Sequence, residues 1–345
     1  MEDNSIQLMN FNSPKVSYTT IDYKSSKEFI NWGRDNKLPN FIYDTISECS
    51  DLQSLINRES DYIKGDDTEI KLPDYLLTDS DSFDNLLTNI INDYVMFGGF
   101  VLEGIRNSKG DLVRLNYVNI MNIRIDEKNT TAYLSNKWGS WNGKNVVKLP
   151  MYNKYEIQPH FIYYYRDNSL RQINPTPKWF AAIKSALVLN ESRNYNLNNI
   201  RNNFSANVLI SLNGTSIKSK ELSEMKEKLS LGYEGSDNAG KTMIINNANA
   251  DGKVEITRLD SDKAADIYKN LQESSQNDLY TAFGMNPILL GRNVQTGFSK
   301  QEFAQAYALY KSTIISPIRR LFERELNKFG VVVHFNDLKI EWSEN

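Results

Sequence analysis

The sequence predicts an α+β fold, because helical and strand patterns occupy separate stretches of the chain. From about residue 30 to residue 96, apolar residues recur mostly at the spacing of amphipathic helices. Between 100 and 168 the pattern changes to short alternating runs separated by turn residues, which predict strands. Long helical patterns return after residue 176 and fill most of the second half, around one small strand-rich section.

The first half begins with residues 1–29, which are polar and patternless and are expected to form an N-terminal arm. Two short helices are predicted between Ile30 and Gly65, and a further helix over 82–96. Gly98 and Gly99 then open the β-rich section. Its predicted strands are FVLEGIRN, LVRLNYVNI, IRIDEKN, TAYLSN, NVVKLP and FIYYYRDN.

The second half opens with Thr176 and Pro177, which are typical of a helix N-cap and first helical position. The helical pattern that follows ends near Ser205. A strand is predicted over 206–212 and ends at the Asn213-Gly214 turn. The charged segment KSKELSEMKEKLSL predicts a helix that ends at Gly232.

The next segment matches the phosphate-binding pattern G-x-x-x-x-G-K-[ST] at Gly235, Gly240, Lys241 and Thr242. Such a loop needs a strand before it and a helix after it, so that the helix N-terminus faces the phosphates. Here a predicted helix precedes the loop, and the strand-like runs KTMIIN and KVEITRL follow, predicted as a hairpin or as two neighbouring strands. The order of elements therefore argues against a nucleotide site.

The final third is helical, beginning with a helix over 262–283 that ends at Gly284 and Pro287. A second helix is predicted from Ser299, where Glu302 completes a capping box. Pro317 falls inside this helical pattern and predicts a kink. The runs VVVHF and LKIEW predict a short two-stranded finish.

The composition excludes several classes of site. One cysteine, Cys49, allows no internal disulfide, and the two histidines, His160 and His334, are too few for a zinc site or a histidine-based triad. Asp and Glu are frequent enough to leave a carboxylate-only magnesium site open, but no cluster of them has distinctive spacing. We predict no catalytic residues, no metal and no cofactor. The sequence shows no secretion signal and no membrane span, which favours synthesis in the cytoplasm.

Four separate segments resemble the portal proteins of tailed bacteriophages. The first is WGRDNKLP at 32–39, similar to a W-x-x-G-x-D-N-x-x-P opening, although Trp32 and Gly33 are adjacent here. The second is NAGK at 238–241, which leads into a strand. The third is AFGMNPILLG at 282–291, where Asn286 replaces a common proline, and the fourth is the F-S-x-x-E segment within 296–302 before the long helix.

The resemblance implies a structural subunit of a ring, usually a dodecamer, that forms a channel at the capsid vertex for DNA packaging and ejection. It implies that double-stranded DNA passes without sequence specificity and that no membrane is involved. The implied partners are further copies of the chain, the terminase large subunit, a head-tail adaptor, and the major capsid or scaffold protein. The implied location is the virion, after assembly in the host bacterial cytoplasm.

The resemblance also implies a division of the chain. After the arm (1–29), it implies a wing (30–175), a stem helix (176–205), a clip (206–259), a second stem helix (260–285), a tunnel loop (286–298), a kinked wing helix (299–330) and a short C-terminal β segment (331–345), with a short or absent crown. In the tunnel loop, the residues expected to face DNA are Arg292, Asn293, Gln295 and Thr296. In the clip, the residues expected to contact the motor or adaptor are Asn213, Gly235, Asp237, Asn238, Lys241 and Asp251.

Several alternatives remain open from the sequence. Without the resemblance, 286–298 is equally well an ordinary turn between helices. Opposite charges on the two stem helices favour contacts between neighbouring subunits, or are simply solvated faces. The basic residues of the first helix are Lys178, Lys184, Arg193 and Arg201, and the acidic residues of the second are Asp262, Asp266, Glu273 and Asp278. Trp179, Phe180 and the tyrosines at 163–165 are interpreted as core or interface residues rather than a platform for bases. A P-loop-type nucleotide-binding enzyme and a monomeric phage adaptor module are the alternative functions.

Overall fold

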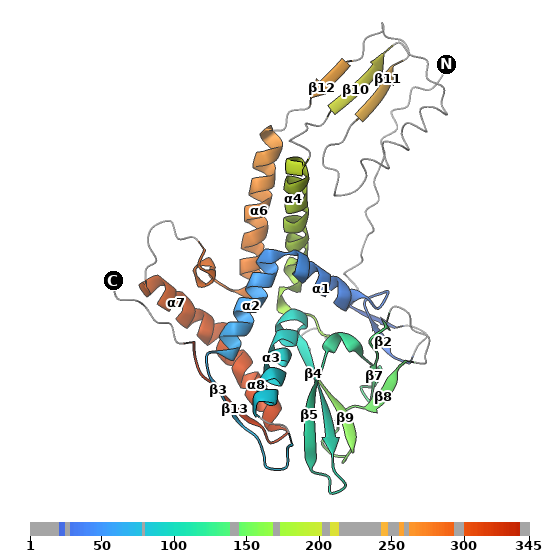
Figure 1. Ribbon diagram of the computed structural model, residues 1–345, viewed down its shortest axis with the longest axis vertical. Helices are drawn as coiled ribbons and strands as arrows, with labels where there is room; N and C mark the ends of the chain where they lie inside the picture. Colours follow the sequence, from blue (N-terminus) through green and yellow to red (C-terminus); the bar gives the residue numbers. More distant parts are fainter. Residues whose placement is uncertain are drawn as a thin grey trace. The chain divides into compact units, whose positions relative to one another are not determined.

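The structure is a computed structural model of the chain, and it describes residues 21–24, 28–77, 80–138, 145–167, 173–201, 208–213, 243–247, 255–258, 262–292 and 300–338 (Figure 1). These residues form helices and mostly antiparallel sheets, which confirms the predicted α+β class. They divide into two compact units. Unit 1 contains the described residues of 21–43, 60–177 and 318–338, and unit 2 those of 44–59 and 178–317.

The helices of the described residues agree with the predicted ones to within a few residues at most ends. The α-helices are α1 Leu38–Glu48, α2 Ser50–Lys64, α3 Ser80–Phe97, α4 Ile183–Arg201, α6 Asp262–Phe283, α7 Lys300–Tyr310 and α8 Ser316–Asn327. The 3-10 helices are η1 Ile120–Asn122, η3 Lys178–Ala182 and η4 Pro287–Leu290, and η5 Lys311–Ile315 is a π-helix.

The strands include all those predicted between residues 100 and 168. They are β1 Asp22–Lys24, β2 Ile30–Trp32, β3 Thr68–Lys71, β4 Gly99–Arg106, β5 Leu112–Val118, β6 Ile123–Ile125, β7 Thr131–Leu134, β8 Val147–Pro150, β9 His160–Arg166, β10 Val208–Asn213, β11 Met243–Asn247, β12 Glu255–Arg258 and β13 Val332–Phe335. The sequence analysis missed β1, β2 and β3. Each has only three or four residues, too few for a clear alternation.

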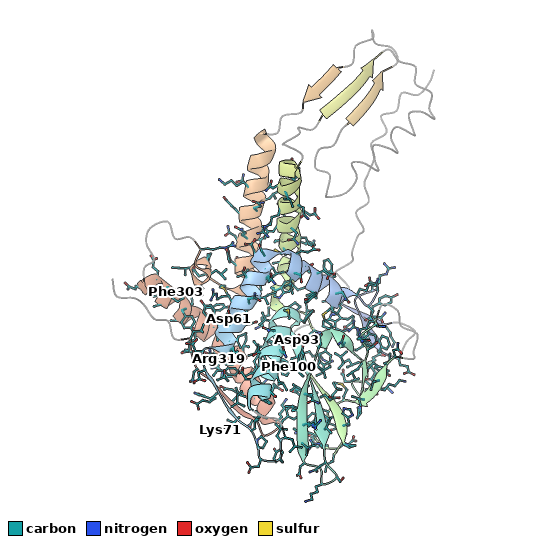
Figure 2. The ribbon with its side chains drawn as sticks, viewed as in Figure 1. Asp61, Lys71, Asp93, Phe100, Phe303 and Arg319 are labelled. Carbon is teal, nitrogen blue, oxygen red and sulfur yellow. The ribbon has the colours of Figure 1, made fainter. Side chains whose placement is uncertain are left out.

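The core of unit 1 forms around the antiparallel sheet β5-β4-β9, in which β4 is central. Phe100 of β4, labelled in Figure 2, is fully buried. Its ring stacks on that of Phe322 of α8, with 5.3 Å between the ring centroids. Tyr94 of α3 meets the edge of the same Phe322 ring. Tyr163 and Tyr164 of β9 are buried as well, which confirms their interpretation as core residues. Aromatic rings therefore join this sheet to α3 and α8.

Arg319 of α8 closes the C-terminal end of α2 within unit 1 (Figure 2). Its guanidinium donates to the carbonyl oxygens of Tyr62 and Ile63, both at 2.8 Å, and to Asn336 at 3.1 Å. It also forms an ion pair with Asp337. The last carbonyls of a helix have no partners inside the helix, so a buried guanidinium is well suited to satisfy them.

Strand β13 pairs antiparallel with β3, with Val333 opposite Ile70. The sequence analysis predicted a two-stranded finish from VVVHF and LKIEW, and the observed partner of the first run is instead β3. Apart from Leu338, which is not in a strand, LKIEW lies outside the described residues. The pairing joins segments more than 260 residues apart, a distance over which local sequence patterns carry no information about register.

In unit 2, α4 and α6 lie side by side (Figure 1). Trp179 of η3 is buried and stacks on Phe283 near the end of α6, with ring planes only 6° apart. Buried Ala186 and Leu189 of α4 and Leu279 of α6 continue the apolar seam. The predicted helical stretch from residue 176 thus begins as a 3-10 turn and continues as α4.

The small sheet of unit 2 has the order β11-β10-β12. β10 is central, parallel to β11 and antiparallel to β12. The prediction that the β11 and β12 segments pair as a hairpin or as neighbours is therefore wrong. Strand β10 instead lies between them, because β11 and β12 can each pair with one of its two open edges.

Pro317 lies in the first turn of α8, directly after η5. The backbone N–H of Ser316 donates to the carbonyl of Lys311, five residues back, so the hydrogen-bond pattern widens just before the proline. Proline has no N–H to continue the α-helical pattern, and the π-turn absorbs this loss. A bend of the helix axis at Pro317 stays a prediction.

Candidate functional site

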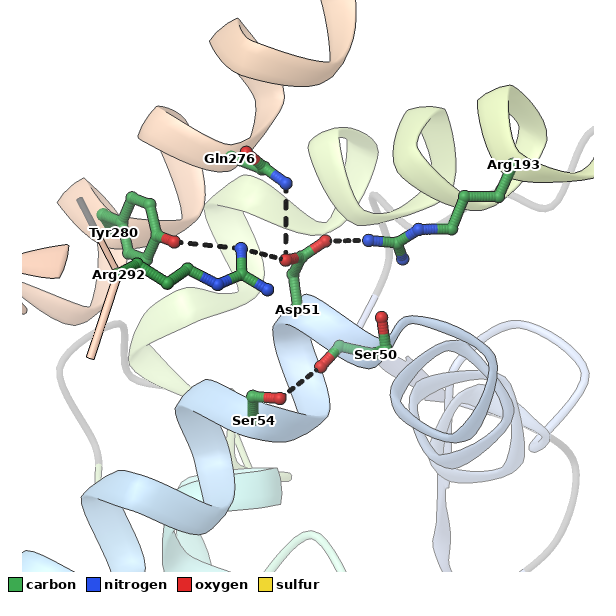
Figure 3. Close-up of polar contacts among 7 residues, drawn as sticks. All are labelled: Ser50, Asp51, Ser54, Arg193, Gln276, Tyr280 and Arg292. Atoms are coloured by element: carbon green, nitrogen blue, oxygen red, sulfur yellow. Dashed lines mark hydrogen bonds and ion pairs between the residues drawn. The ribbon is translucent and has the colours of Figure 1, made fainter. Parts of the chain in front are cut away.

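A cluster of polar side chains gathers around Asp51 in the first turn of α2 (Figure 3). We call Asp51, Arg193, Gln276, Tyr280 and Arg292 the Asp51 cluster; all five belong to unit 2. The Asp51 side chain is only 4% exposed. A carboxylate this deeply buried requires charged or hydrogen-bonding partners, and the cluster supplies them.

Both carboxylate oxygens of Asp51 are occupied. Oδ2 accepts a short hydrogen bond from Arg193 Nη2 of α4. Oδ1 pairs with Arg292 Nη1 at 2.6 Å and accepts from Gln276 Nε2 of α6 at 3.4 Å. Asp51 of α2 therefore connects Arg193 of α4, Gln276 of α6 and Arg292, which lies two residues after the end of η4.

The local backbone explains why Arg292 reaches this cluster. Asn286 caps η4 by accepting from the N–H of Ile288, and Pro287 occupies the first position of the turn. Gly291 then adopts a left-handed conformation with φ of 72°, which a residue with a side chain rarely takes. The chain reverses there, and Arg292 Nη1 also donates to the Tyr280 hydroxyl at 3.2 Å.

The electrostatics of the Asp51 cluster are unbalanced, because two guanidiniums share one carboxylate. The arginine side chains keep 37% (Arg193) and 42% (Arg292) of their surface exposed. Burial opposes the charge of Arg292, but the hydrogen bond from its guanidinium to Asp51 and the charge of that carboxylate raise the arginine pKa above its ordinary value. The cluster therefore carries one excess positive charge next to solvent.

An open cavity of about 460 Å³ adjoins Arg292. Residues of η4 and α7 line it together with Arg292, among them Ile288, Glu302, Gln305 and Leu309. Arg292 therefore borders this cavity while its guanidinium pairs with Asp51.

The predicted site residues are only partly described by the structure. Arg292 lies in the Asp51 cluster, Asn213 is the last residue of β10, and Pro317 lies in α8. The other predicted residues lie outside the described residues: Asn293, Gln295, Thr296, Gly235, Asp237, Asn238, Lys241 and Asp251.

Asp51 itself was missed by the sequence analysis. An acidic residue in the first turn of a helix is ordinary, and nothing in the local pattern marks it as a partner for two distant arginines. Arg193 was assigned only to the charged face of a stem helix, whereas the structure pairs it with Asp51. Such a cluster becomes visible only when the helices pack.

The structure adds information on nucleotide and metal binding. The segment 235–242 lies outside the described residues, but the element that follows it is strand β11, not a helix. A phosphate loop therefore lacks its helix N-terminus at this position. Among the described residues, no group of three or more acidic, histidine or cysteine side chains is arranged to hold a metal ion. None of the helices in the described ranges combines the length and apolar character needed to cross a membrane.

Comparison with protein families decides the identity of the fold. The model of a family described as phage portal protein matches residues 52–345, which is most of the chain. The chain belongs to the phage portal protein family. The resemblance seen in four sequence segments is thereby confirmed, and the chain is a phage portal subunit.

Solved structures agree with this fold. A chain of the virion of a native gene transfer agent particle has a TM-score of 0.57 at 12% identity, over 86% of this chain and 83% of that one. Two neck structures of gene transfer agent particles give similar values. The empty particle, computed with C6 symmetry, has a TM-score of 0.56 at 11% identity, and the native particle, computed with C12 symmetry, 0.54 at 12% identity; both cover 86% of this chain and 84% of that one. No curated protein matches the sequence.

Proposed function

We propose that this portal subunit assembles with copies of itself into a ring, and that the ring is a channel at the capsid vertex for DNA packaging and ejection. The family match over residues 52–345 carries this proposal. The similar neck structures, computed with C12 and C6 symmetry, support a ring of twelve subunits. A ring with rotational symmetry needs complementary surfaces on the two sides of each subunit.

The proposal assigns a role to each part of the chain. Residues 30–175 are the wing, 176–205 and 260–285 the stem helices, 206–259 the clip and 286–298 the tunnel loop. Residues 299–330 are the helix behind the loop, 1–29 an arm, and 331–345 a short β segment. The packing of Phe322 on Phe100 supports the assignment of α8 to the wing, because it places this helix on the wing sheet.

The charge of the chain suits a channel through which DNA slides. A protein that grips many phosphates binds DNA tightly, and each step of translocation then costs more free energy. The net charge of −3 over 345 residues avoids this problem. As the family resemblance implies, we also propose that DNA passes through the ring without sequence-specific contacts.

The proposed partners follow from the same role. The clip meets the terminase large subunit during packaging and the head-tail adaptor afterwards, and the wing meets the major capsid or scaffold protein. Assembly takes place in the host cytoplasm, and the finished ring is part of the virion. The subunit acts as a structural component and not as an enzyme.

Electron microscopy and native mass spectrometry of the purified chain test the proposal. We expect closed rings with a central hole and a mass of about twelve subunits. A chain that stays monomeric at high concentration and in the presence of a scaffold protein would refute the ring. ATP turnover that disappears in Lys241→Ala would favour the nucleotide-binding alternative, despite the strand that follows this loop.

A further inference from the structure

We propose that Asp51 is a positioning residue of the DNA channel, because it holds Arg292 on the stem helices and keeps this arginine from binding DNA phosphates. The inference deepens the proposed function and depends on it for the DNA channel. It replaces the expectation that Arg292 touches phosphate. In this view the ion pair with Asp51 fixes Arg292, and Arg292 is thereby the anchor of the tunnel loop (286–298).

The geometry supports an anchor before any role of DNA is considered. Asp51 is buried, and Arg292 meets its Oδ1 while Arg193 occupies Oδ2. The Tyr280 hydroxyl accepts from Arg292 and Gln276 donates to Asp51, so α6 contributes to both sides of the ion pair. Removing one partner of a buried ion pair is costly, because the other charge stays buried without compensation.

The charge balance links the anchor to DNA. With Asp51 present, Arg193 and Arg292 together leave one excess positive charge; an uncharged residue at position 51 leaves two. Both guanidiniums are partly exposed, and Arg292 borders the open cavity of about 460 Å³. Phosphate oxygens are good partners for a released guanidinium, because they accept two parallel hydrogen bonds.

Every subunit of a ring would contain one Asp51–Arg292 pair. Each arginine that binds a phosphate releases a counterion and steepens the salt dependence of DNA binding by about 0.9 in the logarithmic slope. Twelve such contacts would slow DNA in the channel. A buried carboxylate that occupies Arg292 removes this source of affinity while leaving the residue in place.

The first test needs only Arg292 variants. We measure the affinity of assembled rings for random-sequence double-stranded DNA, as a function of salt, for the wild type, Arg292→Gln and Arg292→Lys. If Asp51 holds Arg292, all three have the same affinity and the same salt slope. If rings of Arg292→Gln instead bind DNA more weakly, with a salt slope that falls by about 0.9 and an affinity that falls about tenfold at 0.1 M salt for each arginine in contact with DNA, Arg292 binds phosphates and the inference is wrong.

The second test releases the arginine. Asp51→Asn should raise the DNA affinity of the rings about tenfold at 0.1 M salt, and steepen the slope by about 0.9, for each released arginine that reaches a phosphate, whereas Asp51→Asn/Arg292→Gln should return to the wild-type value. Asp84→Asn is the matched control, since it breaks the partly exposed Lys64–Asp84 pair of unit 1. A structural role alone would lower stability in Asp51→Asn without any gain in affinity, and that result would overturn the inference.

Different measurements test the proposed ring and the proposed Asp51–Arg292 anchor. The absence of rings in electron micrographs of the wild type refutes the proposed function. The Asp51–Arg292 anchor is measured separately, as the coupling energy of a double-mutant cycle in urea unfolding. A stability change that is additive in the double variant overturns the anchor even if rings form, and if Asp51→Asn does not fold, the Arg292 variants alone decide.

Discussion

The backbone of Asn36 is left-handed, with φ of 63°, and its side chain is buried within the W-G-R-D-N segment of unit 1. Oδ1 of Asn36 accepts from the N–H of Trp32 at 2.9 Å and from Nε of Arg124 at 2.5 Å. The Arg124 guanidinium lies over the rings of Trp32 and Trp138. Arg124 also donates to the backbone carbonyls of Asn36, Met121 and Ile123. The Asn36 side chain is thus one of several acceptors of a buried cation, which the surrounding rings also stabilise.

Asn36→Ala should therefore destabilise unit 1 strongly. It removes the side-chain acceptor of the Arg124 guanidinium and of the Trp32 N–H, and we expect a loss of about 2–4 kcal/mol. Asn129→Ala is the matched control, since Asn129 is also left-handed, with φ of 56°, but is exposed and accepts an exposed hydrogen bond from Arg166 at 2.8 Å. Urea unfolding followed by tryptophan fluorescence measures both variants. Equal losses in the two would show that the backbone conformation matters and the buried bonds do not.

Asp93 of α3 gives unit 1 a pH dependence. It is buried and accepts from the Tyr117 hydroxyl at 3.1 Å and from the N–H of Ile120 at 3.2 Å. Burial raises the pKa of Asp93 to about 7, against an ordinary value of 3.8. The folded state then holds a proton that the unfolded state has lost, so stability falls as the pH rises from about 4 to about 7.

Asp93→Asn should abolish this fall, because the amide oxygen keeps both hydrogen bonds without a charge. Below about pH 4 the two proteins should melt alike, and by pH 7.5 the variant should be more stable by on the order of 4 kcal/mol. Melting curves between pH 3.5 and 8 measure the difference. Burial also raises the pKa of Glu59 to about 7. Glu59 is present in both proteins, so its titration contributes equally to both melting curves. Parallel curves would contradict the prediction.

At the scale of elements, the sheet β5-β4-β9 depends on a small residue at its centre. A Cβ atom on Gly104 of β4 would lie 2.1 Å from the ring of Phe161 on β9. That ring is fully buried and stacks on Phe329, so it has no room to move away. Because Gly104 has no side chain, the Phe161 ring of β9 can lie against the backbone of β4 at this position.

Gly104→Ala should cost about 1–3 kcal/mol through overpacking. Phe161→Leu removes the clashing end of the ring, so the double variant should lose less than the sum of the two single variants, by about 1 kcal/mol. Urea unfolding of the three variants measures this coupling. Additive losses would mean that the backbone, not the ring, determines the cost.

At the scale of the whole molecule, we predict that opposite charges on α4 and α6 join neighbouring subunits of the proposed ring. Lys184 of α4 and Glu273 and Asp278 of α6 are exposed. Asp278 accepts a hydrogen bond from Ser185 of α4 at 2.9 Å, inside the same chain. Lys184 and Glu273 are the residues we assign to contacts between neighbouring subunits.

Lys184→Glu should lower the fraction of rings at low salt, because each subunit interface loses about 0.2–1 kcal/mol. Adding Glu273→Lys should restore assembly, and at about 1 M salt the variants should assemble alike. Native mass spectrometry at several salt concentrations measures the ring fraction. Wild-type assembly of Lys184→Glu at low salt would show that these charges are only solvated faces.

Much of this protein is determined by local sequence. Helical periodicity predicts α3 and α6 within two residues at each end, and alternation predicts the strands from β4 to β9. Four short segments, in the right order, predict the portal family that the comparison confirms. These features depend on residues close together in the chain, so the sequence alone contains them.

Tertiary structure alone decided the rest. The pairing of β13 with β3, the central place of β10 and the meeting of Arg193 and Arg292 on Asp51 each join residues that are distant in sequence. Burial is what makes Asp51 require two partners, and burial is a property of the packed chain. Arg292 therefore looks like a free cation in the sequence, and the packing of α2 against α4 and α6 turns it into an anchor.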